Sequence, residues 1–436
     1  MARLFGTDGV RGLANGEVLT PELAMSLAAA AAGQLGGGLA VIGRDTRPSG
    51  SLLEAAAAAG FAAAGCDVQL LGVVPTPTVA HVCAAGRADL GLMISASHNA
   101  MPDNGLKLFG RGGQKLADED EDAIEGRLGR PYARPTGTDV GVVRPAPEGL
   151  VRAYEQSLLD SLEAPLDGLR IVVDCAQGSA SLIGPDVYRR AGADVIAIFA
   201  DGDGAHINDG CGATHLEALQ AAVVAHGADV GLAHDGDADR CLAVDATGAV
   251  VDGDRILAIC ALGLLERGRL ANDTVVGTVM SNLGFVHAMR DAGIKVLQTA
   301  VGDRYVLEAM RAGGHVLGGE QSGHLVLADH ATTGDGLLTG LQLLGRVAAT
   351  GRSLADLGAV VRTLPQVLLN VRADRTRAQA ADVLEAVAGE EAGLAGEGRV
   401  LLRASGTEPL VRVMVEAPTQ DTAQAVAERL AAVVAR

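Results

Sequence analysis

Short apolar runs alternate with longer helical stretches along the first two thirds of the chain. The runs at residues 39–43, 68–71 and 90–94 are rich in Val, Ile and Leu and are interrupted only by Gln69, which is typical of strands buried on both faces. Residues 51–65 between the first two runs have helical character. This alternation predicts right-handed strand–helix–strand crossovers and a mainly parallel sheet.

The same rhythm restarts twice further along the chain. The predicted strands of these two later units are residues 170–175, 194–200 and 229–233, then residues 274–279, 295–299 and 316–318. Three units of similar layout predict an internal structural repeat.

The tail has a different order of elements. We expect strands at 366–372, 400–403 and 411–416 and helices at 378–388 and 422–434, the last with apolar positions at helical spacing. This order predicts a smaller α+β domain.

The length of 436 residues exceeds what one hydrophobic core usually supports, so several domains are expected. Residues 130–147, with their Pro and Arg, are predicted to be a linker. The predicted domains are 1–155, 156–253 and 254–366, all α/β, and 367–436, which is α+β.

Composition limits the partners of the chain. A formal charge of −18 argues against a nucleic-acid or anionic membrane surface, although a few cations in a cleft could still bind an anionic substrate. Six scattered cysteines without a C-x-x-C pair indicate reduced structural thiols. With no apolar signal core and no stretch long enough to span a bilayer, the sequence predicts a cytoplasmic protein.

Three aspartates alternate directly after a strand-like apolar run. Asp235, Asp237 and Asp239 could share one face of an extended chain or converge in a loop. An EF-hand is excluded, because Arg240 and Ala246 stand where that loop has Gly and Glu. Carboxylate oxygens suit Mg²⁺, so the spacing favours a metal site over a solvated acidic loop.

Ser97 lies just past a predicted strand, where open α/β sheets bind their ligands. A serine hydroxyl is a poor nucleophile until a base, a cation or a metal assists it. His98, the next residue, is expected to point elsewhere, whereas Lys107 could fold back over the serine. A phosphoserine at 97 could complete the shell of a cation held by the aspartates.

Two further polar clusters could bind a sugar phosphate. Glu320, Ser322 and His324 alternate, so an extended segment would present all three on one side toward sugar hydroxyls; the alternative is a polar edge strand. Residues 403–412 place hydroxyls, Gly and Arg between two predicted strands, which would form either an anion nest or an ordinary hairpin. The glycine-rich residues 6–12 match neither a P-loop nor a dinucleotide fingerprint.

Taken together, these stretches resemble the α-D-phosphohexomutase family over essentially the whole chain. The resemblance implies three similar mixed-sheet α/β domains and a smaller C-terminal α+β domain around one deep cleft. Residues 207–215 (INDGCGATH), 300–306 (AVGDRYV) and 319–324 (GEQSGH) are similar to members that act on amino-sugar phosphates. One departure is Ala100, where the family often has proline.

The resemblance also implies a role for each candidate residue. Ser97 would carry the phosphoryl group as phosphoserine and, with three aspartates, hold Mg²⁺. Lys107, Arg11 and His324 are candidates for proton transfer, with acid and base left open. The implied substrate-binding residues are Arg240, which helps neutralise charge, Glu320, Ser322 and His324 for the sugar, and Arg403, Ser405, Gly406, Thr407 and Arg412 for the phosphate that is not reacting.

The implied reaction is an intramolecular phosphoryl transfer of the isomerase class. It would interconvert glucosamine 6-phosphate and glucosamine 1-phosphate through a hexosamine 1,6-bisphosphate, which also primes the enzyme, for UDP-N-acetylglucosamine and peptidoglycan precursor synthesis. A homodimer is implied, without nucleic-acid or membrane partners. The competing hypotheses are phosphoglucomutase or phosphomannomutase activity, a Mg²⁺-dependent phosphatase, and a sugar-phosphate sensor.

Overall fold

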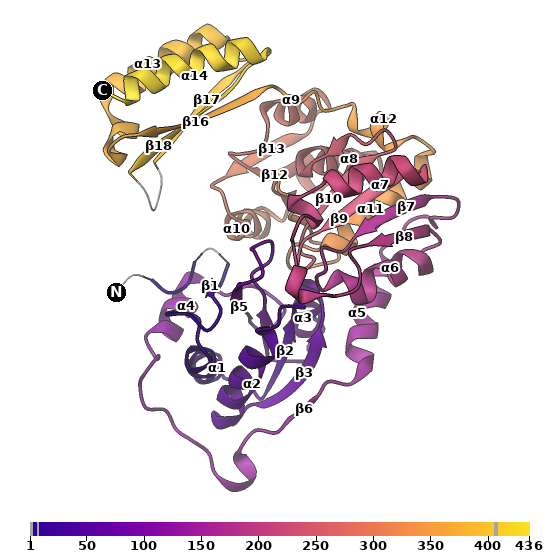
Figure 1. The fold of residues 1–436 in the computed structure, drawn as a ribbon, viewed down its shortest axis with the longest axis vertical. Helices are drawn as coiled ribbons and strands as arrows, with labels where there is room; N and C mark the ends of the chain where they lie inside the picture. The colour runs from indigo at the N-terminus through magenta and orange to yellow at the C-terminus, as the bar shows by residue number, and fades with distance from the viewer. Residues whose placement is uncertain (1–2, 7, 405–408) are drawn as a thin grey trace. The chain divides into compact units, whose positions relative to one another are not determined.

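A computed structural model describes residues 3–6, 8–404 and 409–436. The chain forms two compact units (Figure 1). The first comprises Met1–Met280 and Ile294–Ala359, and the second comprises Ser281–Gly293 and Val360–Arg436. Three sheets belong to the first unit and one to the second.

The first sheet has the strand order β1-β5-β4-β2-β3-β6. Its strands are β1 (Val10–Leu13), β2 (Leu39–Arg44), β3 (Asp67–Val73), β4 (Leu90–Ile94), β5 (Asp103–Phe109) and β6 (Val143–Pro145). β2 pairs in parallel with β3 and β4, whereas β5 runs antiparallel to β4 and β1. The sheet is therefore mixed, because the short connection after β4 can only return the chain antiparallel. The predicted linker contributes edge strand β6, which is parallel to β3.

Helices cover both faces of this sheet. The helices of this region are α1 (Pro21–Leu35), α2 (Gly50–Ala63), α3 (Thr76–Ala84), α4 (Asp118–Glu125) and α5 (Glu148–Asp160). Because successive strand residues point to opposite faces, Ile42 packs in the cluster of α1 and α2, whereas Val41 packs in that of α3. A Cβ at Gly60 would lie 2.1 Å from the carbonyl oxygen of Met25, so this glycine permits the close contact of α1 and α2.

The second sheet repeats the pattern with the order β11-β10-β9-β7-β8. Its elements are β7 (Arg170–Asp174), α6 (Ala180–Arg190), β8 (Asp194–Ile198), α7 (Glu217–His226), β9 (Val230–His234), β10 (Cys241–Asp245) and β11 (Val250–Val251). β7 is parallel to β8 and β9, and β10 turns back antiparallel to β9. The loop between β9 and β10 carries the three aspartates.

The third sheet has the order β13-β12-β14-β15 and the same sense of pairing. The elements of this part of the first unit are α8 (Gly253–Glu266), β12 (Thr274–Thr278), β13 (Lys295–Thr299), α10 (Asp303–Gly313), β14 (Leu317–Gly319), β15 (Leu325–Leu327), α11 (Gly336–Thr350) and α12 (Leu354–Gly358). The hairpin of β14 and β15 carries Glu320 to His324. Three mixed sheets of similar build confirm the predicted fold class for this unit.

The second unit is built on one antiparallel sheet with the order β16-β18-β17. Its elements are α9 (Leu283–Asp291), β16 (Gln366–Arg372), α13 (Ala381–Leu394), β17 (Arg399–Ala404), β18 (Leu410–Glu416) and α14 (Gln420–Val434). Glu416 is buried and accepts bonds from the backbone N–H of Leu283 at 2.9 Å and from Arg399 Nε at 2.7 Å. These bonds join α9 to the sheet.

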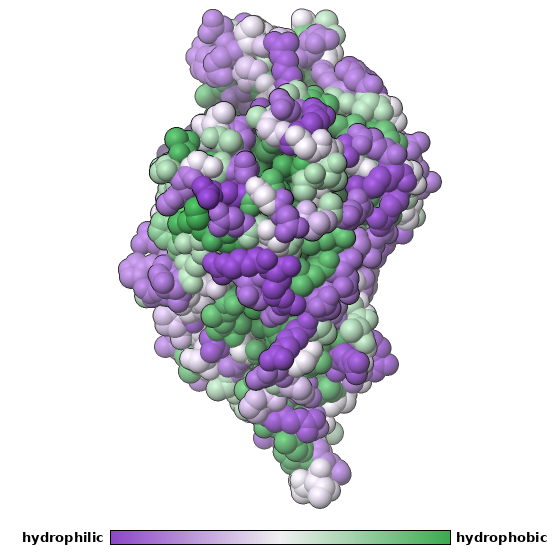
Figure 2. Space-filling view, turned by 90° about the vertical axis from the view of Figure 1, so that its right-hand side faces the viewer, coloured by the Kyte–Doolittle hydropathy of each residue, from purple (hydrophilic) through white to green (hydrophobic). Residues whose placement is uncertain are grey.

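The face of the molecule drawn in Figure 2 carries both polar and apolar residues. On the face in Figure 2, hydrophilic residues are spread between smaller hydrophobic areas. In the part of the chain that the structure describes, no helix combines the length and the apolar character that crossing a membrane requires.

Candidate active site

The three alternating aspartates converge in a buried loop after β9. Asp235, Asp237 and Asp239 each offer a carboxylate oxygen, and these oxygens lie within 4.8 Å of one another. The chain turns here because Ala238 has a φ of +55°, and its N–H bonds to the carbonyl of Asp235. The side chains therefore meet in a loop and not along an extended strand.

The three clustered carboxylates concentrate negative charge, which a bound cation would offset. Burial, followed by repulsion from Asp239 and Asp237, raises the pKa of Asp235 to about 7. Asp237 Oδ1 and Asp239 Oδ1 are buried and, within the described residues, accept no hydrogen bond. Buried carboxylate oxygens that accept no hydrogen bond are suitable ligands for a hard divalent cation, so the donor set fits Mg²⁺.

Ser97 lies against this cluster, just past the carboxyl end of β4. Its side chain is 1% exposed, and its Oγ donates to Asp235 Oδ2 at 2.5 Å. His98 Nδ1 lies 3.3 Å from the same Oγ, so the expectation that His98 points elsewhere is wrong. Ser97 has a φ of +55°, and this left-handed backbone turns neighbouring side chains in a way that an extended chain would not.

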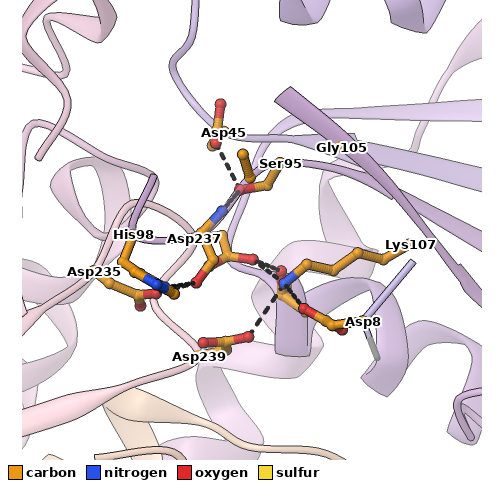
Figure 3. Close-up of polar contacts among 12 residues, drawn as sticks. Asp8, Asp45, Ser95, His98, Gly105, Lys107, Asp235, Asp237 and Asp239 are labelled. Carbon is orange, nitrogen blue, oxygen red and sulfur yellow. Dashed lines mark hydrogen bonds and ion pairs between the residues drawn. The ribbon is translucent and has the colours of Figure 1, made fainter. Parts of the chain in front are cut away.

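Lys107 brings a positive charge from β5, the neighbour of β4 (Figure 3). Its Nζ lies 2.8 Å from Asp237 Oδ2, 2.9 Å from Asp8 Oδ2 and 3.3 Å from Asp239 Oδ2. Burial alone would lower the pKa of Lys107, but these carboxylates together raise it well above its ordinary value. The carboxylates therefore hold Lys107 in its charged ammonium form.

Asp8 belongs to the site, although the sequence drew attention only to the glycines and Arg11 around it. Arg11 on β1 donates to Asp8 at 2.5 Å and, at 3.3 Å, to the carbonyl of Ala96. Lys115 pairs with Asp8 at 2.5 Å and also with Asp303, the first residue of α10. Burial raises the pKa of Asp8, but Lys107, Lys115 and Arg11 outweigh it and lower the pKa well below the usual range.

His324 reaches the aspartates from the third sheet. Its Nδ1 lies 3.5 Å from Asp239 Oδ1, and its Nε2 lies 3.5 Å from Asp303 Oδ2. A Cβ at Gly334 would be 2.4 Å from the imidazole, so that glycine makes room for the ring. Burial lowers the pKa of His324, but Asp239 and Asp303 together raise it above its ordinary value.

Glu320, Ser322 and His324 do not form the extended row that their alternation suggested. Residues 320–324 are the turn between β14 and β15, closed by a bond from the N–H of Gly323 to the carbonyl of Glu320. Gly323 has a φ of +89°, which an extended segment would not contain. Glu320 Oε1 accepts from the N–H of Gly302 at 3.1 Å, whereas His324 faces the metal loop.

Two arginines of the predicted phosphate clamp share one face of the second unit's sheet. Arg403 on β17 and Arg412 on β18 are cross-strand partners, and both are exposed. Like charges placed opposite each other destabilise a sheet unless an anion lies between them. Ser405, Gly406 and Thr407 of the same predicted clamp lie outside the described residues.

Arg240 lies beside the metal loop, with Nε 3.9 Å from both Asp235 and Asp239. Its backbone N–H donates to Asp235 Oδ1 at 3.2 Å. Arg240 therefore offsets part of the acidic charge, at longer range than Lys107.

Sequence reasoning missed several residues that support this centre. Thr76 Oγ1 donates to Asp237 at 2.5 Å, and Ser95 Oγ donates to Asp45 at 2.6 Å while accepting from the N–H of Ser97 at 2.9 Å. Asp45 follows β2 as Ser97 follows β4, so the strand-end rule applied to Ser97 would also have found it.

Comparison with known proteins identifies the family. The models of the phosphoglucomutase/phosphomannomutase α/β/α domains I, II and III match residues 2–133, 151–248 and 252–363, and the model of the C-terminal domain matches 368–433. The chain belongs to the phosphoglucomutase/phosphomannomutase family of enzymes.

Within this family, the chain is similar over its full length to proteins of one named activity. The chain is 65% identical to a phosphoglucosamine mutase of Frankia casuarinae, covering 100% of this chain and 98% of that one. It is 62% identical to a phosphoglucosamine mutase of Saccharopolyspora erythraea, covering 100% and 99%.

Solved structures share the fold. A phosphoglucomutase/phosphomannomutase family protein of Burkholderia thailandensis superposes with a TM-score of 0.82 at 25% identity, covering 99% of this chain and 97% of that one. The N-acetylphosphoglucosamine mutase of Aspergillus fumigatus, solved with GlcNAc-6P and magnesium, gives a TM-score of 0.69 at 18% identity, covering 99% and 95%.

Proposed function

We propose that this enzyme is a phosphoglucosamine mutase, which interconverts glucosamine 6-phosphate and glucosamine 1-phosphate. The observation that carries the chemistry is the buried Ser97 hydroxyl bonded at 2.5 Å to one aspartate of a carboxylate cluster with an ammonium beside it. The choice of sugar is supported by the full-length relatives at 62–65% identity that bear this name.

Ser97 would carry the phosphoryl group between the two positions of the sugar. As phosphoserine, it loses its Oγ–P bond while a hydroxyl oxygen of glucosamine 6-phosphate forms the new O–P bond. The hydroxyl proton leaves for a base, and the serine oxygen takes up a proton. The resulting 1,6-bisphosphate turns within the site and returns its other phosphoryl group to Ser97, so no phosphate is lost or gained.

The residues around Ser97 would stabilise charge and manage the proton. Asp235, Asp237 and Asp239 would hold Mg²⁺ together with the serine oxygen or its phosphate. When bound, the cation would act as a Lewis acid that withdraws negative charge from the phosphoryl group during transfer. Lys107, Arg11 and His324 are the candidates to hold positive charge and to move the proton. Arg11 bonds to the carbonyl of Ala96, next to Ser97, and His324 contacts Asp239.

The remaining predicted residues would bind the parts of the substrate that do not react. Glu320 and Ser322 lie on the same turn as His324, and Ser322 Oγ is buried and, among the described residues, unpaired, as a group awaiting a sugar hydroxyl would be. Arg403 and Arg412 would hold the second phosphate together with Ser405, Gly406 and Thr407, which lie between them in the sequence. The exposed arginine pair supports this assignment.

Other parts of the proposal concern organisation. We place the domain boundaries at 1–155, 156–253, 254–366 and 367–436. Each of the first three sheets lies within one of these ranges, and the fourth lies within 367–436 except for Gln366, the first residue of β16. On the family resemblance, we also propose that the protein is a cytoplasmic homodimer without nucleic-acid partners. We further propose that hexosamine 1,6-bisphosphate primes it.

The substrate is tested by measuring turnover of glucosamine 6-phosphate and of glucose 1-phosphate, each with Mg²⁺ and a trace of hexose 1,6-bisphosphate. We expect a much higher kcat/KM for the amino sugar. A preference for glucose 1-phosphate would keep the chemistry and overturn the substrate.

The phosphoserine is tested with Ser97→Ala. We expect this variant to fold and to lose turnover completely, because no other group can accept the phosphoryl group at that position. The wild type should interconvert the sugar phosphates without net release of inorganic phosphate. Stoichiometric phosphate release would instead identify a phosphatase, and substantial turnover by Ser97→Ala would refute the assignment.

A further inference from the structure

The peptide that carries Ser97 is held from two directions. Arg47 Nη2 donates to the carbonyl oxygens of Ser97 at 3.1 Å and Asn99 at 2.8 Å. Asn208 Nδ2 donates to the same two oxygens at 2.9 and 3.1 Å. Arg47 follows β2 of the first sheet, whereas Asn208 precedes α7 of the second. Two distant loops therefore close on one pair of carbonyl groups.

Arg47 uses its whole donor set on this loop and its support. Its Nη1 donates to the carbonyls of Ala100 at 2.5 Å and Asp103 at 3.0 Å, and its Nε donates to Asp45 at 2.9 Å. A guanidinium has five N–H donors in a fixed planar fork, and all five have an acceptor here. The side chain is 1% exposed. A lysine offers three donors from one point and cannot reproduce this pattern.

Asn208 connects the same peptide to the metal loop. A Cβ at Gly236 would lie 2.6 Å from the carbonyl oxygen of Ser97 and 3.0 Å from Asn208 Nδ2, so the backbone between Asp235 and Asp237 packs directly against this contact. Asn208 is 7% exposed and has a φ of +59°. The carbonyl of Ser97 is thus the point at which the serine loop, the metal loop and the Asn208 segment meet.

We infer that Arg47 and Asn208 are positioning residues for phosphoryl transfer, which hold the Ser97 peptide so that its oxygen stays against Asp235. The inference rests on the proposed function of Ser97. A left-handed backbone is unfavourable at a residue other than glycine, so it persists only where surrounding bonds impose it. The bonds from Arg47 and Asn208 go to backbone carbonyls and impose this conformation.

Loosening the peptide should affect the chemical step more than substrate binding. A displacement of about 1 Å in a reacting group can cost roughly 100-fold in rate. The residues proposed to bind the sugar and the distal phosphate lie on other elements, so KM should change little. A phosphoserine that is less well held should also lose more of its phosphoryl groups to water.

The test compares Asn208→Gly and Arg47→Lys with a matched control. Glycine removes the donors of Asn208 and tolerates its positive φ, and lysine keeps the charge of Arg47 while losing the fork. The control is Gln342→Ala on α11, because Gln342 Nε2 also donates two bonds, of 2.9 and 3.1 Å, to Ser161 at the end of α5. We expect kcat to fall about 100-fold in both test variants, with nearly unchanged KM and more inorganic phosphate per turnover.

Gln342→Ala should lose about as much thermal stability as the two test variants, and it should keep the wild-type kcat. Test variants that fold and turn over at the wild-type rate would overturn the inference, as would an equal loss of kcat in Gln342→Ala. If Arg47→Lys does not fold, Asn208→Gly alone decides. If the wild-type protein turns over neither glucosamine 6-phosphate nor glucosamine 1-phosphate, that result contradicts the proposed function and not the positioning role. The positioning role is then read from the rate at which hexose 1,6-bisphosphate phosphorylates the protein, followed by intact mass: slower loading in the variants supports it, and equal loading refutes it.

Discussion

At the scale of single residues, Lys107 is a buried cation that contacts three carboxylates of the site. It is 2% exposed and lies among Asp8, Asp237 and Asp239. Replacing it in Lys107→Met removes the ammonium from the buried carboxylates Asp237 and Asp239, and breaking a buried charge pair costs about 3–5 kcal/mol. We expect the free energy of unfolding in urea, measured without divalent cations, to fall by about that amount.

The matched control for Lys107 is Lys295→Met, because Lys295 is exposed on edge strand β13. That change should stay within about 0.5 kcal/mol of the wild type, as surface substitutions usually do. Equal losses in the two variants would show that the buried ammonium contributes nothing particular.

The residue scale also shows where sequence reasoning ends. Ser97 could be found because a strand-end position follows from the apolar pattern. The contact with His98 could not, because a left-handed φ at serine leaves no mark in the sequence. Arg47 and Asn208 were missed for a related reason: they bind backbone carbonyls, which every residue carries, so no spacing of side chains reveals them.

At the scale of elements, the start of α11 makes a pH-dependent contribution to stability. Asp335 caps this helix by accepting from the N–H of Leu338 at 2.9 Å and also accepts from Tyr154 Oη at 3.0 Å. Burial raises its pKa to about 6, with a smaller contribution from Asp239, although the bonds from Leu338 and Tyr154 lower it. Because the unfolded value is about 3.9, this group favours the fold fully below pH 3.9 and loses that contribution as the pH rises through 6.

Asp335→Asn should remove this dependence. Asparagine is also a good N-cap, and the tyrosine hydroxyl can accept from its amide. We expect the variant to gain up to about 3 kcal/mol over the wild type at pH 8, with the gain shrinking toward pH 4, in urea unfolding at both pH values. A gain independent of pH would contradict the raised pKa. Asp335→Ala removes both the charge and the capping hydrogen bond to Leu338, so its comparison with Asp335→Asn separates the two effects.

The elements themselves were predictable to different degrees. Strand β4 begins and ends at the predicted residues 90–94, because five consecutive apolar residues bounded by polar ones leave no alternative. Strand β5 was not predicted, since it contains the polar residues Asp103, Asn104 and Lys107, and its place is set by pairing with β4 and β1. The apolar pattern alone therefore predicted a mainly parallel sheet, whereas the family resemblance implied the mixed sheet that the structure has. Tertiary pairing, which local pattern does not contain, makes it mixed.

At the scale of the whole molecule, metal binding should distinguish the two compact units. The carboxylate cluster lies in the first unit, and the second has its own core around Val411, Val413 and Val415. A ligand that binds only the folded state stabilises it by about 2.7 kcal/mol at 100 times its Kd. Excess Mg²⁺ should therefore slow the slowest-exchanging amides of β4 and β9 by about 100-fold relative to EDTA. Amides of β16 and β18 should be unaffected.

Hydrogen exchange followed by mass spectrometry measures both units in one sample, and Asp237→Asn is the control that should lose the response of the first unit. If Mg²⁺ slows exchange equally in β4 and β18, the two units unfold together, and the prediction that they unfold independently is wrong. If it slows neither in the wild type, the three carboxylates do not form a Mg²⁺ site, because a cation bound there must stabilise the loop between β9 and β10 that holds it. Retention of the full response in Asp237→Asn would place the cation elsewhere.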